Sequence, residues 1–203
     1  IISSDSTFVY ALRGEYNTQT GQACLMDRSH IYKEMRDIVG DSLYYDEEKG
    51  VSEAFGSVVL LDVENHCMLT GHYCRYEDEH GVALATDSAV FHEFAESDTL
   101  YVHADTLKMI TYNAQTDSVY RDLFAYHKVR MFRTDIQGVC DSLVTHERDS
   151  CTYMFGQPIL WNDVQQVFGE EIRVYNNDST IDWIHVVNQA MTIEQVDSVS
   201  YNQ

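Results

Sequence analysis

The chain of 203 residues carries 33 acidic against 13 basic residues, which gives a net charge of -20 at pH 7. This balance argues against nucleic acid as a partner, because nucleic-acid binding depends on Lys and Arg side chains that neutralise phosphates. It also disfavours docking on an anionic membrane surface. We interpret the carboxylates as lying on solvated strand faces, where they keep the protein soluble and protect sheet edges from aggregation.

Length and composition predict one domain that spans residues 1–203, since an all-β core of this size is commonly continuous. Pro158 is the only proline and the ten glycines are scattered, so no linker is evident. The chain begins with Ile1, which fits the removal of a signal peptide. It ends on Tyr201-Asn202-Gln203, which reads as the middle of a strand-and-turn unit, so we expect the native chain to be longer.

A short phrase recurs along the chain: Asp, then Ser or Thr, then a branched apolar residue. Asp and Ser/Thr side chains bond their local backbone at turns, so each copy predicts a turn beside a strand, and the set predicts a stack of strand-and-turn units. Two longer stretches also align, Gly14-Glu15-Tyr16 with Gly71-His72-Tyr73 and the first copy of the phrase with the second. The copies are Asp41-Ser42-Leu43, Asp98-Thr99-Leu100, Asp105-Thr106-Leu107, Asp117-Ser118-Val119, Asp141-Ser142-Leu143, the stretched Asp178-Ser179-Thr180-Ile181, and Asp197-Ser198-Val199.

In chain order, the first ambiguous segment is 29–39, where Ile31, Met35 and Ile38 fit a helix or a strand; we predict a strand. Later segments alternate with period two, which is typical of half-buried strands: 100–105, 128–131 and 172–175. Turns are predicted between them at 17–21, 46–50, 77–81, 113–117, 134–138 and 176–178. The many Tyr, Phe, Val, Ile and Thr residues agree with strand preference.

The sequence contains no motif for catalysis. It has no GxGxxG or GxxxxGK[ST] phosphate loop and no GxSxG nucleophile elbow. Ser, His and Asp are abundant, but their abundance on an alternating β scaffold does not indicate a triad. We therefore expect a non-enzymatic protein without a cofactor.

One local cluster could bind a metal ion: His66, Cys67, His72 and Cys74. Its spacing matches no standard zinc site, and His66 and Cys67 would point to opposite faces of a strand. We interpret these residues as buried cysteines and edge histidines, and expect no metal. The five cysteines form no CxxC pair, so no disulfide framework is indicated and at least one thiol should be free.

The second half carries the most specific pattern of the chain. The segments are Tyr101-Val102-His103-Ala104-Asp105-Thr106-Leu107, 129–143, Pro158-Ile159-Leu160-Trp161, Gln165-Gln166, Gly169-Glu170 and Ile172-Arg173-Val174-Tyr175. This succession resembles the OstA/LptA-type lipopolysaccharide-transport (LPS-assembly) proteins in their larger, Bacteroidetes-like form. The resemblance covers most of the chain and is best from about residue 98 to 190.

This resemblance implies an all-β fold, a β-jellyroll of stacked short antiparallel strands that forms a twisted sandwich open at both ends. It further implies a periplasmic or outer-membrane-associated protein of outer-membrane biogenesis, whose apolar slot takes the lipid A acyl chains of lipopolysaccharide. Other β-jellyroll proteins, or further copies of the chain, would associate end to end through unpaired edge strands.

Strand alternation then gives candidate lipid-binding residues for the slot. The same residues could instead fill a closed core. In that case the alternative function is a structural or adhesive β-repeat module that binds protein or glycan through an exposed Tyr-rich face. The candidates are Leu100, Val102, Leu107, Met109, Val129, Met131, Val139, Leu143, Ile159, Trp161, Ile172 and Val174.

Overall fold

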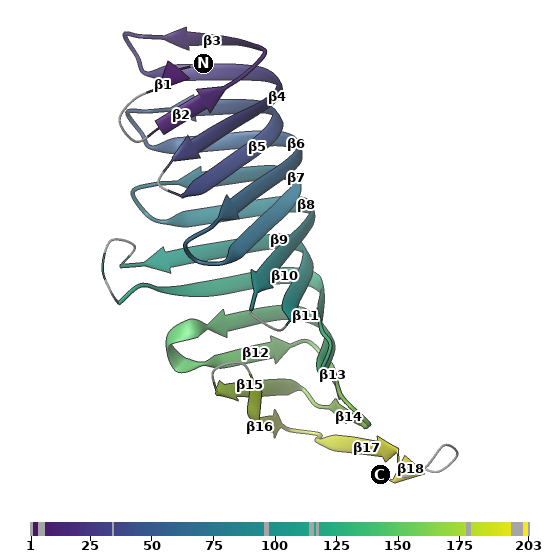
Figure 1. Cartoon of the computed structure of the whole chain (residues 1–203). Helices are drawn as coiled ribbons and strands as arrows, with labels where there is room; N and C mark the ends of the chain where they lie inside the picture. The colour runs from purple at the N-terminus through teal and green to yellow at the C-terminus, as the bar shows by residue number, and fades with distance from the viewer. Residues whose placement is uncertain are drawn as a thin grey trace.

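The computed structural model describes residues 2–3, 7–33, 35–95, 98–113, 116, 118–177, 180–195 and 201–202. These residues form one sheet of 18 strands, and neighbouring strands pair antiparallel, so the predicted all-β class is confirmed. The strands stack along the long axis of the molecule, with the N- and C-termini at opposite ends (Figure 1).

The strands are β1 (Ile2–Ser3), β2 (Thr7–Tyr10), β3 (Arg13–Asn17), β4 (Gln22–Lys33), β5 (Arg36–Asp46), β6 (Val51–Asp62), β7 (Cys67–Glu77), β8 (Val82–Phe94), β9 (Thr99–Tyr112), β10 (Tyr120–Arg133), β11 (Ile136–His146), β12 (Cys151–Phe155), β13 (Ile159–Asn162), β14 (Gln165–Phe168), β15 (Glu171–Asn177), β16 (Thr180–Val187), β17 (Met191–Gln195) and β18 (Tyr201–Asn202). A 3-10 turn, η1 (Glu147–Asp149), joins β11 to β12.

Each long strand from β4 to β11 bends in its middle. The pairing register shifts there, and four of the strands place two consecutive residues with positive φ at the shift, such as Asp27 (φ 65) and Arg28 (φ 54) in β4. Gly56 (φ 72) and Ser57 (φ 46) do the same in β6. Such bulges turn a strand sharply. The sheet is thereby folded over into two halves, which Figure 1 shows as strands that curve back on themselves.

We call these halves the first wall and the second wall. They face each other closely: a Cβ atom added to Gly138 on the second wall would lie 2.8 Å from the Cε of Met154 on the first. The first wall consists of residues 13–17, 22–26, 42–46, 51–55, 73–77, 82–86, 106–112, 120–126, 142–146, 151–155, 171–177 and 180–187. The second consists of 7–10, 29–33, 36–40, 58–62, 67–71, 89–94, 99–104, 129–133, 136–140, 159–162, 165–168 and 191–195.

The bends correct one prediction about the recurring phrase. Asp41-Ser42-Leu43, Asp105-Thr106-Leu107 and Asp141-Ser142-Leu143 lie inside β5, β9 and β11 at the bends, where turns between strands were predicted. Their leucines are buried in the core, at 2%, 0% and 1% exposure. The Asp-Ser/Thr-Leu phrase therefore marks the bend at which a strand passes from one wall to the other. The leucine after the bend points into the core. The copy at 98–100 does start a strand, while Asp117, Asp178-Ser179 and Asp197-Ser198-Val199 lie outside the described residues.

Turns were correctly predicted at 17–21, 46–50 and 77–81. Side-chain oxygens support the first two, because Asn17 Oδ1 accepts from Gln19 N at 2.9 Å and Asp46 Oδ1 from Lys49 N at 3.1 Å. Successive turns are also bonded to each other: Asp78 N donates to Gly50 O at 2.8 Å, and Thr111 N to Gly81 O at 2.8 Å. These bonds fix the order in which the units stack.

The other predicted turns need adjustment. The turn at 134–138 is shorter than predicted, since Gly138 lies within β11 and faces the core. Thr116 N bonds Asn113 O at 2.9 Å in the turn at 113–117, of which residues 114–115 and 117 lie outside the described part. At 176–178 the described residues Asn176 and Asn177 end β15, and Asp178 is not described.

The segment 29–39 is extended and not helical, but it forms two strands joined by a turn where a single strand was predicted. Lys33 ends β4, Met35 takes a left-handed conformation (φ 64) in a tight turn, and Arg36 begins β5. The alignment of Gly14 with Gly71 has no structural counterpart, because Gly71 lies at the bend of β7 whereas Gly14 pairs with Leu25 within β3. The structural repeat is one pair of bent strands, and it is shorter than the aligned offset.

The stacked turns predict unequal costs for two glycine substitutions. Gly81 and Gly50 have nearly the same φ, 58° and 59°. The left-handed conformation therefore lowers the free energy of unfolding by about 1–2 kcal/mol for an alanine at either position. At Gly81 the new Cβ would also lie 2.5 Å from Thr111 O, a backbone atom, whereas at Gly50 it lies 3.2 Å from the Asp78 side chain. We expect Gly81→Ala to lower the free energy of unfolding by about 2–4 kcal/mol and Gly50→Ala by about 1–2 kcal/mol in urea titrations. Equal losses would contradict this packing of the turns.

Candidate functional site

An open cleft lies between the two walls in the section from β8 to β15, with an empty volume of about 880 Å³ that includes solvent at its mouth. Phe91 and Leu100 of the second wall and Met109 and Leu123 of the first wall form its apolar lining. The remaining lining residues are polar or charged: Glu93, Arg121, Arg133, Thr145, His146, Glu147, Ser150, Thr152 and Asn176. The cleft therefore combines an apolar floor with a polar rim.

Arg121 holds the two walls together at one end of this cleft. Its Nη1 donates to Asn65 O at 3.0 Å and contacts Cys67 Sγ at 3.3 Å, both in or beside the second wall. Its Nη2 lies 3.0 Å from Glu147 Oε1, on the side of the first wall. These contacts join the two walls at this part of the cleft.

Glu93 is the acidic group that faces the cleft from the second wall. Burial raises the pKa of Glu93, and the positive charges of Arg121 and Arg133 act in the opposite direction. Both arginines are also held by other carboxylates, since Arg133 Nη2 donates to Asp135 Oδ2 at 2.9 Å. The rim thus carries charges of both signs that largely neutralise one another.

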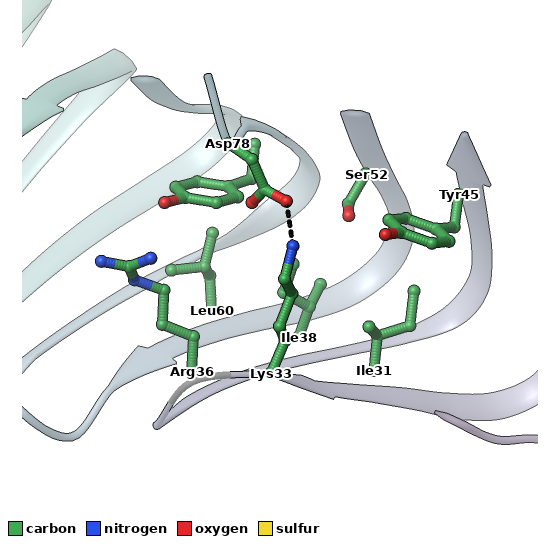
Figure 2. A pocket seen from close by; sticks show the side chains of 9 residues that line it. Ile31, Lys33, Arg36, Ile38, Tyr45, Ser52, Leu60 and Asp78 are labelled. Carbon is green, nitrogen blue, oxygen red and sulfur yellow. Dashed lines mark hydrogen bonds and ion pairs between the residues drawn. The ribbon is translucent and has the colours of Figure 1, made fainter. Parts of the chain in front are cut away.

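A second, smaller cavity of about 390 Å³ lies nearer the N-terminus between the same walls. Lys33 reaches across its mouth to Asp78, with 2.6 Å between Nζ and Oδ2, as Figure 2 shows. Arg36 lies 5.4 Å from the centre of the Tyr76 ring, and its Nε lies 3.0 Å from Asp62 Oδ2. These contacts close the mouth in this section.

Nine of the twelve candidate slot residues face the space between the walls: Leu100, Val102, Leu107, Met109, Val129, Met131, Leu143, Ile172 and Val174. Only Leu100 and Met109 line the cleft itself. The other seven are packed in the core beneath it.

Val139, Ile159 and Trp161 lie on the opposite side of the second wall, which corrects the prediction of their direction. Their neighbours Gly138 and Leu160 are the buried, inward residues of β11 and β13. Alternation could not decide between the two sides, because both rows of these strands are apolar. Sequence reasoning also missed Phe91 and Leu123 in the cleft, although each continues an alternating run, Ala89-Val90-Phe91 and Leu123-Phe124-Ala125.

The cysteines of the interior are poor nucleophiles. Burial raises the pKa of Cys67 to about 11, of Cys74 to about 12 and of Cys140 to about 12, so their thiols stay protonated at neutral pH. All five cysteines are free, and Cys24 is the exposed one. Across the described residues, no group of three or more His, Cys, Asp or Glu side chains is arranged to hold a metal ion.

The bent strands, the facing walls and the unclosed stack define an open-ended β-jellyroll of stacked antiparallel strands. In the described ranges, no helix has the length and apolar character needed to cross a membrane.

Comparison with known proteins gives a structural likeness. No protein-family model matches the sequence, and no curated protein matches it significantly. Among solved structures, the chain is similar to LptH from Pseudomonas aeruginosa, described as the LptA homologous periplasmic component of the conserved lipopolysaccharide transport device. The match has a TM-score of 0.38 and 11% identity, and covers 79% of this chain and 94% of that chain. A likeness of this size concerns the shape of the fold and carries no argument about activity.

The raised pKa of Glu93 predicts a pH-dependent stability. An acid whose folded pKa lies above its unfolded value stabilises the protein below the unfolded pKa, near 4.5, and this contribution is lost as the pH rises through the folded pKa. We therefore expect Glu93→Gln to have a higher free energy of unfolding than the wild type at pH 8, and this advantage to disappear at pH 4. Urea titrations at both pH values measure this, with Glu79→Gln in an exposed turn as the control. If Glu93→Gln is less stable at pH 8, attraction by the two arginines outweighs burial.

Proposed function

We propose that the chain is a non-enzymatic lipid-handling protein of outer-membrane biogenesis that shelters lipopolysaccharide acyl chains in the cleft between its walls. The observation that carries this proposal is the apolar floor formed by Phe91, Leu100, Met109 and Leu123, which is open to solvent on one side. Removal of apolar surface from water stabilises a bound acyl chain by about 25 cal/mol per Å². In this proposal Leu100 and Met109 contact the acyl chain directly. The seven other inward candidates are packed in the core and support these two side chains.

The charges of the site favour acyl chains over a phosphorylated headgroup as the part that is held. Arg121 and Arg133 are the two cations of the cleft, and both are already paired with carboxylates, Glu147 and Asp135. The chain as a whole carries a charge of -20. A phosphate would have to displace these carboxylates, whereas an acyl chain needs only the apolar floor.

The N-terminal end of the stack supports the proposed end-to-end partners. β3 has one paired neighbour, β4, and the burial pattern of Arg13–Asn17 is exposed throughout. Leu12 beside it is 71% exposed, and a cavity of about 560 Å³ there reaches Val9 and Leu25. An unpaired edge next to exposed apolar surface fits another β-jellyroll, or a second copy, that extends the sheet. Such a chain of domains belongs in the periplasm or at the outer membrane.

A second candidate function rests on aromatic side chains outside the first wall. Tyr175 and Trp183 stack with 4.0 Å between their ring centres, and Arg173 lies 5.6 Å from the centre of the Tyr153 ring. Trp183 is among the exposed large side chains. An adhesive module that binds protein or glycan would use this surface, and the cleft would then stay empty.

Site-specific photo-crosslinking in the native envelope separates the two functions. We expect probes at Leu100 and Leu123, which line the cleft, to form lipopolysaccharide adducts. Matched control probes at Tyr101 and Phe124 sit one residue further along the same strands on the outer faces, and we expect at least tenfold fewer adducts there. Adduct formation is measured by the mobility shift of the protein and by detection of lipopolysaccharide in the shifted band.

Equal labelling at inner and outer positions would mean non-specific contact and would contradict the proposal. Absence of adducts at all four positions, in a folded and abundant protein, would favour the adhesive module.

A further inference from the structure

The outward side of the second wall is an apolar face that nothing in the described chain covers. Residues that pair across neighbouring strands share a side of the sheet, so the register of the strands identifies its members. We call this set the outer face of the second wall. Its members are Phe8, Tyr10, His30, Tyr32, Asp37, Val39, Val59, Leu61, Met68, Thr70, Val90, His92, Tyr101, His103, Arg130, Phe132, Gln137, Val139, Ile159, Trp161, Gln166, Phe168, Met191 and Ile193.

The first wall presents a different surface to the outside. There Arg75 Nη2 lies 2.9 Å from Glu77 Oε1, and Tyr73 OH donates to Glu53 Oε1 at 2.6 Å, as on an ordinary solvated face. An antiparallel sheet with one solvated side normally alternates apolar and polar residues. Both sides of the second wall are apolar. This indicates that another protein surface covers the outer face of the second wall when the protein functions.

Only two residues of this face carry a formal charge at neutral pH, and each lacks a full set of partners. Asp37 Oδ1 is buried without a hydrogen-bond partner, while its Oδ2 lies 3.6 Å from His30 Nδ1. Arg130 is exposed, and within the described residues it makes no ion pair. A buried acceptor without a partner costs about 1–3 kcal/mol. Asp37, whose side chain is 30% exposed, and the exposed Arg130 are thus one acid and one base on a face that otherwise carries no formal charge.

We propose that this face binds the same face of a second copy of the chain, back to back, about a twofold axis that runs along the strands between β7 and β8. Such an axis reverses the strand order of the second copy, so that β5 lies over β10. Asp37 then lies diagonally opposite Arg130 of the second copy, and the symmetry makes this contact twice. Two walls pack at about 10 Å, a gap that an aspartate and an arginine side chain together can span.

The charge and size of the face fit this occupant. Two chains of charge -20 repel each other over most of their surfaces, but this face lets them meet where they carry almost no net charge. The eight strands from β4 to β11 extend for about 35 Å at a spacing of about 4.8 Å. With two outward rows of side chains, the face is comparable to the ~800 Å² that each partner of a standard interface buries. Both ends of the stack stay free, so the inference does not depend on the proposed function.

Sedimentation of the full chain over a range of concentrations tests the association. We expect a dimer for the wild type, and at least tenfold weaker dimerisation for Phe132→Glu, whose side chain is 47% exposed at the centre of the β10 segment of this face. Tyr126→Glu is the matched control: it lies on the same strand, is 39% exposed, and belongs to the first wall. Circular dichroism shows that each variant keeps its strands.

Crosslinking tests the orientation. In a Cys24→Ser background, which removes the exposed native thiol, one copy carries Asp37→Cys and a differently tagged copy carries Arg130→Cys. A short bifunctional maleimide should join the two tags in the mixture and should form far less product in either variant alone. Lys108→Cys, on the outside of the first wall, replaces Asp37→Cys in the control mixture.

A wild type that stays monomeric at every concentration overturns the proposal, as does a dimer that Phe132→Glu leaves intact, because that dimer must use the strand edges. A dimer that is weakened by Phe132→Glu, but yields no mixed crosslink, overturns the twofold arrangement. Selective loss with Phe132→Glu together with the mixed crosslink supports it.

Discussion

The bend in the middle of each long strand is the constraint on which the rest of the structure depends. A straight antiparallel sheet has two open faces, and this sheet gains an interior only because each strand folds over. In β4, β6, β8 and β10 the bend includes residues with a left-handed backbone, beginning at Asp27, Gly56, Asp87 and His127. Glycine, and to a lesser degree aspartate, adopts this conformation at lower cost than most residues, which suits Gly56, Asp27 and Asp87 to these positions.

The sequence predicted the strands and their stacking more completely than it predicted the side of the sheet on which each side chain lies. Period-two alternation and turn chemistry were sufficient to predict strands, the stacked units and the turns at Asn17, Asp46 and Glu77. The bends were missed because an aspartate followed by serine reads as a turn between strands, and nothing in the local sequence shows that pairing continues on both sides of Asp41. That information lies in the partner strands, which are only known once the register is fixed.

The candidate site residues also show that alternation alone does not always identify the inward side of a strand. In β9 and β10 the outward positions hold His103, Lys128 and Arg130, so alternation assigned the inward residues correctly. In β11 and β13 the outward positions hold Val139 and Ile159, and the inward residue before Val139 in β11 is Gly138, between the inward Ile136 and Cys140. Hydrophobicity then favours the wrong side, because Gly138 leaves room for the side chains of the opposite wall and has none of its own.

Ion pairs and side-chain packing divide the space between the walls into a closed section near the N-terminus and an open cleft from β8 onward. Towards the N-terminus, Lys33 and Asp78 pair across the mouth of the smaller cavity and close this part of the stack. In the section of the larger cleft, Phe91 and Leu123 line the space between the described walls and are 5% and 6% exposed. The rim of this cleft carries the ion pairs of Arg121 with Glu147 and of Arg133 with Asp135. An apolar lining with a charge-balanced rim fits the proposal that the cleft holds acyl chains and leaves a polar headgroup outside.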